Sequence, residues 1–138
     1  MKQSKFDLVM DYIDENIKND TETIKRGIIN LIGINSNTFG QFFTVLTGDT
    51  LGSYIRNRRL YFAAMDLLRQ PKMTISDIAF EYGYSDQSAF TRAVSGKYKM
   101  SPNEIRTSWE VDISNDKYLY SDFNPNTSNP RSVHIWRE

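Results

Sequence analysis

The sequence has 138 residues, which is enough for one folded domain with a real hydrophobic core and an appended segment. It contains no cysteine, which excludes a disulfide framework and thiolate metal sites and suits a reducing cytoplasm. No apolar run is long enough to cross a bilayer and no signal-peptide core is visible, so we expect no membrane partner.

Charge is balanced overall but is uneven along the chain. The 17 basic and 17 acidic side chains cancel. Residues 1–50 carry 5 basic and 7 acidic side chains, residues 51–106 carry 9 and 5, and residues 107–138 carry 3 and 5. The net positive charge of the chain therefore lies in residues 51–106.

An amphipathic helix is predicted over residues 4–18. Apolar residues recur there at intervals of three and four, which places them on one side of a helix. They are Phe6, Val9, Met10, Ile13 and Ile17. We expect this stripe to lie in the core.

A first helix-turn-helix pattern follows, over about residues 23–47. We predict a supporting helix over residues 24–32, a turn at residues 33–35 and a recognition helix over residues 36–47, which Gly48 would end. The residues of the second helix predicted to face the core are Phe39, Phe42, Phe43 and Leu46. Those predicted to point outward, and so to be available to DNA, are Asn37, Thr38, Gly40, Gln41 and Thr44.

A long helix is predicted over residues 51–70, with Thr50 as its N-cap and Pro71 as its stop. At 1.5 Å per residue it would be about 30 Å long, close to the roughly 34 Å of one turn of B-DNA. A rigid connector of this length would hold two recognition helices in successive major grooves. Three side chains near its start are candidates for phosphate contacts or for pairing with acidic neighbours. They are Arg56, Arg58 and Arg59.

A second helix-turn-helix pattern comes after the connector. A short helix would begin near Thr74, Gly83 would supply a sharp turn, and a second helix would start near Ser85. Its outward face carries amides, hydroxyls and an arginine, the groups that read base edges in a major groove; Gln87 suits adenine, and Arg92 suits guanine or phosphate. The candidate DNA-binding residues on this face are Gln87, Ser88, Thr91 and Arg92.

The last part of the chain changes character. A capping box from Ser101 to Glu104 predicts one more short helix. From Trp109 on, apolar and polar residues alternate, as at Val111 and Ile113, which predicts short strands or irregular structure. We therefore expect a short C-terminal extension of β or irregular structure over residues 109–138.

No arrangement typical of catalysis or cofactor binding is visible. The glycines are scattered without the spacing of a phosphate-binding loop, and the acidic residues form no paired-carboxylate arrangement. The single histidine, His134, lies in the extension and is interpreted as a strand-edge side chain. We predict neither an enzyme nor a bound metal or cofactor.

The second motif resembles that of the AraC/XylS family of bacterial transcription regulators. The resemblance rests on Asp77-Ile78-Ala79, Gly83-Tyr84, Ser88-Ala89-Phe90-Thr91-Arg92 and Ser101-Pro102, and the stretch from Leu51 to Leu60 with Ala63-Ala64 is similar to the MarA–SoxS–Rob subgroup. It covers about residues 6–108. It implies an all-α domain over residues 1–108, with helix-turn-helix motifs at about 23–47 and 74–98 joined by the connecting helix over 51–70.

The resemblance also implies positions for DNA contacts. The first recognition helix would contact bases at Asn37, Gly40 and Gln41, where the subgroup has Trp, Gln and Arg. Thr44 stands where the subgroup has a basic residue. Either the first motif reads a different DNA sequence, or it has become mainly a scaffold.

We therefore expect a sequence-specific, DNA-binding transcription regulator of the bacterial cytoplasm, associated with the nucleoid. By resemblance, it would bind an asymmetric promoter site in double-stranded DNA as a monomer and activate transcription by contacting RNA polymerase. Two alternatives stay open. One is a helix-turn-helix scaffold that binds a protein partner or modulates another regulator. The other is a ligand-sensing regulator whose aromatic C-terminal extension closes a small apolar pocket.

Overall fold

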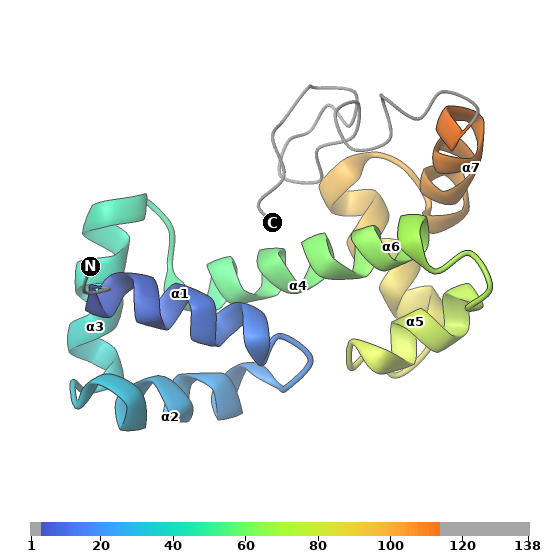
Figure 1. Cartoon of the computed structure of the whole chain (residues 1–138). Helices are drawn as coiled ribbons and strands as arrows, with labels where there is room; N and C mark the ends of the chain where they lie inside the picture. Colours follow the sequence, from blue (N-terminus) through green and yellow to red (C-terminus); the bar gives the residue numbers. More distant parts are fainter. Residues whose placement is uncertain (1–3, 114–138) are drawn as a thin grey trace. The chain divides into compact units, whose positions relative to one another are not determined.

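The computed structural model describes residues 4–113, and this part of the chain is built of α-helices without a strand. The helices are α1 (Lys5–Glu15), α2 (Thr21–Ile32), α3 (Ser36–Thr47), α4 (Leu51–Arg69), α5 (Ile75–Glu81), α6 (Gln87–Tyr98) and α7 (Pro102–Ile113) (Figure 1). The predicted all-α fold with two helix-turn-helix motifs and a long connecting helix is confirmed. None of these helices is both long and apolar enough to span a bilayer.

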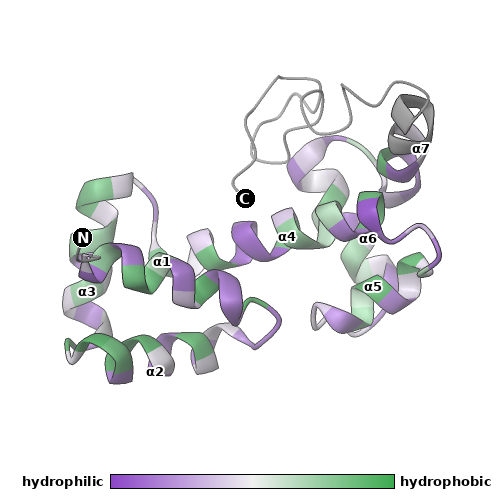
Figure 2. Cartoon of the chain, in the orientation of Figure 1, coloured by the Kyte–Doolittle hydropathy of each residue, from purple (hydrophilic) through white to green (hydrophobic). Residues whose placement is uncertain are grey.

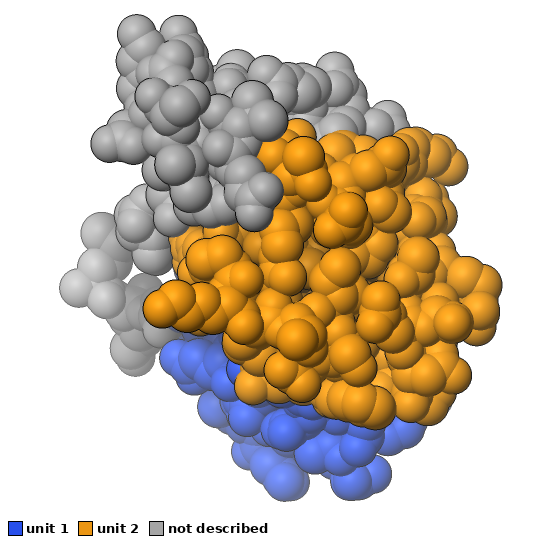
Figure 3. Space-filling model, turned by 90° about the vertical axis from the view of Figure 1, so that its right-hand side faces the viewer, with its two compact units in different colours: residues 1–59 blue, residues 60–138 orange. Residues whose placement is uncertain are grey.

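The chain divides into two compact units, residues 1–59 and residues 60–138, which Figure 3 shows in different colours. We call them unit 1 and unit 2. Unit 1 contains α1, α2, α3 and the start of α4, whereas unit 2 contains the rest of α4 with α5, α6 and α7. Each helix-turn-helix motif therefore has a core of its own.

Helix starts follow the capping chemistry written in the sequence. Four N-cap side chains each accept a hydrogen bond from the backbone N–H three residues later, at 2.8–2.9 Å. They are Asp20, Asn35, Thr74 and Asp86. The second recognition helix thus begins slightly later than predicted, because Asp86 caps it and not Ser85.

The capping box predicted for the last helix is present. The Ser101 N–H donates to Glu104 Oε1 at 2.8 Å, and the Glu104 N–H donates to Ser101 Oγ at 3.0 Å. The strand predicted from Trp109, Val111 and Ile113 is wrong, because α7 continues through these residues. Neither glycine nor proline stands there to end the helix, so it propagates past the short alternating stretch. The rest of the predicted extension, residues 114–138 with His134, lies outside the described residues.

Unit 1 is held together by α1 against α2 and by α2 against α3. The predicted stripe of α1 contributes buried Val9, Ile13 and Ile17 to its core. At one point the helices meet at a glycine: a Cβ on Gly27 would collide with the ring of Tyr12. Phe43, fully buried, has its ring centroid 6.1 Å from that of Phe6 and 5.4 Å from that of Tyr54. Aromatic contacts of this kind fix α3 against α1 and the start of α4.

Only part of the apolar side of α3 is buried. Phe39 and Phe43 lie in the core, but Phe42 is 53% exposed and Leu46 is 54% exposed, so their predicted burial is wrong. Val45 is 83% exposed beside them. Spacing of three and four residues puts Phe42, Val45 and Leu46 on one side of the helix, next to the buried stripe, and unit 1 covers only the stripe. We call these three residues the α3 apolar face; in Figure 2 hydrophobic residues predominate toward the end of α3.

Unit 2 packs α5 on α6 and α6 on α7. Phe90, Val94 and Tyr98 line the buried side of α6. The Tyr82 hydroxyl donates to Asp66 Oδ2 at 2.7 Å and so ties the end of α5 to α4. Burial, together with this hydrogen bond, raises the pKa of the Tyr82 hydroxyl well above its ordinary value.

The end of α4 is closed by a side chain from α7. Arg106 donates through Nε to the Leu67 carbonyl and through Nη2 to the Gln70 carbonyl, each at 3.1 Å. The Leu67 carbonyl belongs to the last turn of α4, where a helix has no backbone donor of its own left for it. The Gln70 carbonyl, just past the helix, also accepts from the Met73 N–H at 3.0 Å. A cation there also complements the helix dipole.

Candidate nucleic-acid interface

The first helix-turn-helix motif consists of α2, a short turn and α3. Gly33 adopts φ +73°, in the left-handed region that suits glycine, and its N–H donates to the Ile29 carbonyl at 2.8 Å. Two residues later, the Asn35 side chain accepts from the Thr38 N–H at 2.9 Å and starts α3. Local sequence thus defines the motif: a glycine that ends one helix and an amide that caps the next.

A groove of about 710 Å³ runs along α3 within unit 1. Side chains and backbone from α2, α3 and the beginning of α4 line it. The lining residues are Lys25, Asn37, Gly40, Gln41, Thr44, Val45, Thr50, Leu51, Gly52 and Arg56. The groove therefore gathers four of the predicted DNA-binding residues, Asn37, Gln41, Thr44 and Arg56. Thr38 is exposed but does not line it.

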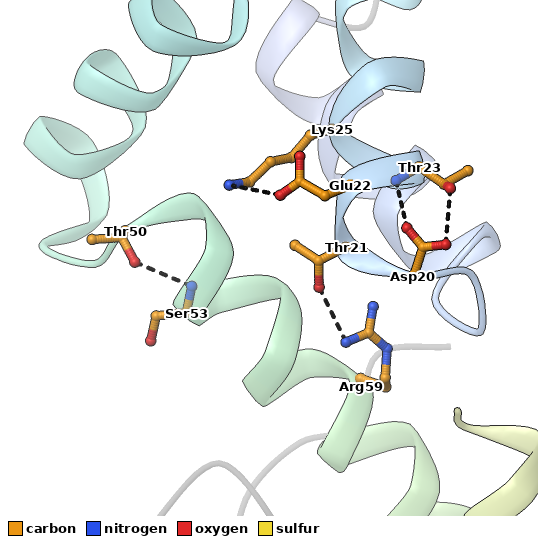
Figure 4. Close-up of polar contacts among 8 residues, drawn as sticks. All are labelled: Asp20, Thr21, Glu22, Thr23, Lys25, Thr50, Ser53 and Arg59. Carbon is orange, nitrogen blue, oxygen red and sulfur yellow. Dashed lines mark hydrogen bonds and ion pairs between the residues drawn. The ribbon is translucent and has the colours of Figure 1, made fainter. Parts of the chain in front are cut away.

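Two cationic side chains converge in this groove. A Cβ built on Gly52 would lie 3.3 Å from Arg56 Nη1 and 3.7 Å from Lys25 Nζ, so both charges lie close to this glycine. In Figure 4, Lys25 points from α2 toward the side where Thr50 and the first turn of α4 lie. Lys25 also forms a long ion pair with Glu22 of its own helix, at 4.0 Å. Lys25 was not among the predicted binding residues, because its approach to Gly52 of α4 joins positions far apart in the chain.

The other two arginines near the start of α4, Arg58 and Arg59, are used inside unit 1. The Arg58 guanidinium makes a two-point contact with Asp14, Nε to Oδ1 at 2.8 Å and Nη2 to Oδ2 at 2.9 Å. Arg59 donates to the Ile17 and Asn19 carbonyls and to Thr21 Oγ1, the last drawn in Figure 4. These contacts hold α4 against α1 and the loop before α2. Of the three arginines, only Arg56 remains exposed in the groove.

The second motif presents a polar face on α6. Gly83, at φ +87°, turns the chain between α5 and α6, and the Asp86 carboxylate accepts from the Ala89 N–H at 2.8 Å. Gln87, Ser88 and Arg92 are exposed, and Thr91 is half-buried. By helical spacing, Ser88 and Arg92 lie on the side of α6 away from its buried apolar residues, whereas Thr91 borders the buried stripe and Gln87 is exposed at the first residue of the helix. The carboxylate of Asp86 is occupied as a helix cap.

Known proteins match this arrangement over most of the chain. A family model described as a helix-turn-helix domain matches residues 29–108, more than half of the sequence. The Transposon Tn10 TetD protein of Escherichia coli is 36% identical over 106 residues, which cover 75% of this chain and 75% of TetD. The probable transcription factor PqrA of Proteus vulgaris is 38% identical over 93 residues, 67% of this chain and 70% of PqrA.

A shorter match falls on a characterised subgroup. The regulatory protein SoxS of Escherichia coli K12 is 39% identical over 66 residues, which cover 48% of this chain and 61% of SoxS. The family match runs from the end of α2 through α3, the connecting helix and the second motif into α7. The chain therefore belongs to the AraC/XylS family of helix-turn-helix, DNA-binding transcription regulators, among the relatives of the MarA–SoxS–Rob subgroup.

Proposed function

We propose that this regulator binds an asymmetric promoter site as a monomer and activates transcription, in the bacterial cytoplasm and on the nucleoid. The observation that carries sequence-specific binding is the polar face of α6, where Gln87, Ser88 and Arg92 stand exposed on a helix fixed by its cap and its buried side. Amide and guanidinium groups on such a helix match the donors and acceptors of adenine and guanine in the major groove.

Use of two successive major grooves is supported by α4. It is one continuous helix of 19 residues, which at 1.5 Å per residue is about 28 Å long. That length is near the roughly 34 Å of one turn of B-DNA. The residues proposed to contact the first DNA major groove are Asn37, Gln41, Thr44 and Arg56. Those proposed to contact the second major groove are Gln87, Ser88, Thr91 and Arg92.

Selection of bound duplexes from a random pool, at near-physiological salt, tests this proposal. Two enriched boxes about 10 bp apart, centre to centre, are the expected outcome. A single enriched box would mean that one motif reads DNA while the other acts as a scaffold. No enrichment would reject sequence-specific binding.

The contribution of α6 is tested with Arg92→Ala. If Arg92 makes a bidentate contact with a base, the variant should lose about 1–3 kcal/mol of specific binding and relax its preference at one position. Lys97→Ala is the matched control, because it removes a charge from a different side of the same helix. Equal losses in the two variants would assign Arg92 only a general electrostatic role.

Monomeric binding and activation need separate measurements. Titration of the selected duplex in an analytical ultracentrifuge should give one chain per site. Transcription from a promoter carrying the site should rise when the protein is added to purified RNA polymerase. A two-to-one complex or a fall in transcription would correct the corresponding part of the proposal.

One observation favours a second candidate function, that of a protein-interaction module. The α3 apolar face leaves three large hydrophobic side chains in solvent on a single helix. Clustered apolar side chains of this kind often mark protein contacts. Duplex affinity with almost no salt dependence would favour this alternative, since DNA binding releases counterions and depends steeply on salt. The ligand-sensing alternative concerns residues outside the described part of the chain.

A further inference from the structure

We propose that the groove of unit 1 reads an A·T-containing box, with Asn37 and Gln41 against adenine edges and one DNA phosphate held between Lys25 and Arg56. This inference rests on the proposed function and specifies what the first motif recognises. It also gives the motif a source of positive charge outside its recognition helix.

The base preference follows from what α3 can offer. Neither a basic nor an acidic residue occurs in its 12 residues, so the helix itself provides no Arg or Lys for guanine and no carboxylate for the cytosine amino group. It does offer the amides of Asn37 and Gln41, four residues apart and therefore on one side of the helix. Amides of this type pair bidentately with adenine N6 and N7.

Apolar groups next to these amides suit the other base of the pair. Thr44 is one turn beyond Gln41, and Val45 follows it; both line the groove and both are exposed. Their methyl groups can contact the C5-methyl of thymine, which only A·T pairs display in the major groove. The lining of α3 is therefore complementary to adenine on one strand and thymine on the other.

The phosphate site follows from the two converging cations. Lys25 from α2 and Arg56 from α4 come close to the same glycine, Gly52, where like charges repel each other unless an anion lies between them. Glu22 offsets this repulsion only weakly, at 4.0 Å from Lys25 and with its side chain 74% exposed. A phosphate on the rim of the groove would neutralise both cations while the bases face α3.

Glycine gives the duplex room to approach. Gly40 lies on the groove side of α3, between Asn37 and Gln41 in the sequence, and a Cβ there would meet nothing within 4 Å. The backbone of α3 is therefore uncovered at this point. Close approach of backbone to a ligand is a common use of glycine.

Base reading is tested with Asn37→Ala, Gln41→Ala and their combination, on the duplex selected by the wild-type protein. The double variant should no longer show a sequence preference at one of the two boxes. That box should consist mainly of A·T pairs. Replacing an A·T pair in that box by G·C should weaken binding by the wild-type protein about 5- to 150-fold. The same base-pair change should weaken binding by the double variant less than about twofold. A box rich in G·C, or a box unaffected by both substitutions, overturns the inference.

The shared phosphate is tested by salt dependence. The variant Lys25→Gln/Arg56→Gln should reduce the slope of log affinity against log salt by about 0.9, the value for one phosphate. A reduction of about twice that would mean two separate phosphates, and no reduction would mean none; either result overturns the shared site. Arg26→Gln is the matched control, because Arg26 is an exposed cation of α2 outside the groove and should leave the slope unchanged.

These outcomes separate the inference from the function on which it rests. If the box read by α6 persists and remains sensitive to Arg92→Ala while the A·T box or the slope change is absent, only the inference fails. If neither box is enriched from the random pool, the proposed function fails as well.

Discussion

The two helix-turn-helix motifs share a backbone plan but differ in surface chemistry. Both turn through a glycine with positive φ, Gly33 and Gly83, and both start their second helix with a capping side chain, Asn35 or Asp86. Yet α3 carries no charge and exposes large apolar side chains, whereas α6 carries an exposed arginine and leaves none of its large apolar side chains exposed. The two motifs therefore have the same local fold. The first motif departs from the subgroup pattern in the side chains that its recognition helix exposes.

The sharpest way to test this view is to remove the aromatic residue that anchors α3. Phe43→Ala should destabilise the protein by about 3–5 kcal/mol, because it empties a fully buried site between three other rings. Phe42→Ala is the matched control and should cost far less, because Phe42 is half exposed. Urea denaturation checks both. Equal costs would mean that α3 lies differently in unit 1.

The arginines of α4 provide the next test, since one should serve the fold and another DNA. Arg58→Ala should lower the free energy of unfolding by about 1–2 kcal/mol, because it breaks a two-point, partly solvated contact with Asp14. Arg56→Ala should leave stability nearly unchanged and weaken DNA binding. Thermal unfolding and duplex titration of both variants would show whether the two roles are separate. The reverse pattern would contradict the geometry of unit 1.

In unit 2 the corresponding anchor is a tyrosine. Tyr82→Phe should cost about 1 kcal/mol, because it removes the hydrogen bond to Asp66. The folded-state pKa of Tyr82 is raised, so its contribution is complete below pH 10 and is lost as pH rises above that value. Chemical denaturation at neutral and alkaline pH should show the wild-type protein losing its advantage over the variant above pH 10. If the difference in free energy of unfolding between the two proteins stays constant with pH, the pKa of the Tyr82 hydroxyl is not raised by folding.

The smallest expected effect compares a glycine in each recognition helix. Gly40 in α3 and Gly96 in α6 both have open space where a Cβ would stand, so alanine should fit at either position. Each substitution should stabilise the protein by about 0.5–1 kcal/mol through helix propensity. Thermal unfolding measures this gain. A loss of stability at only one position would show that one recognition helix is strained and the other is not.

Local chemistry explains why much of the fold could be predicted from the sequence. The capping box at Ser101 and Glu104, the cap at Thr74 and the helix end at Gly48 depend on residues within four positions of one another. Helix bounds were therefore predictable to within a few residues. The alternation of apolar and polar residues at 109–113 led to a wrong strand prediction. Three alternating apolar residues are also compatible with a helix when no glycine or proline ends it.

Long-range contacts explain what the sequence could not show. Arg58 contacts Asp14 and Arg59 contacts Asn19 across 44 and 40 positions of the chain, and these pairings leave Arg56 as the arginine exposed in the groove. Lys25 joins the groove for the same reason. The exposure of Phe42 escaped prediction because an apolar stripe does not reveal how much of its width a neighbouring helix covers.

The meeting of Gly27 with Tyr12 has a consequence for how this protein can vary between strains and species. A side chain at position 27 and a tyrosine ring at position 12 cannot occupy the same space, because even a single Cβ would overlap the ring. Any lineage that acquires a larger residue at position 27 is therefore expected to carry a smaller one at position 12, or to release the ring into solvent. The two positions should change together, although fifteen residues separate them.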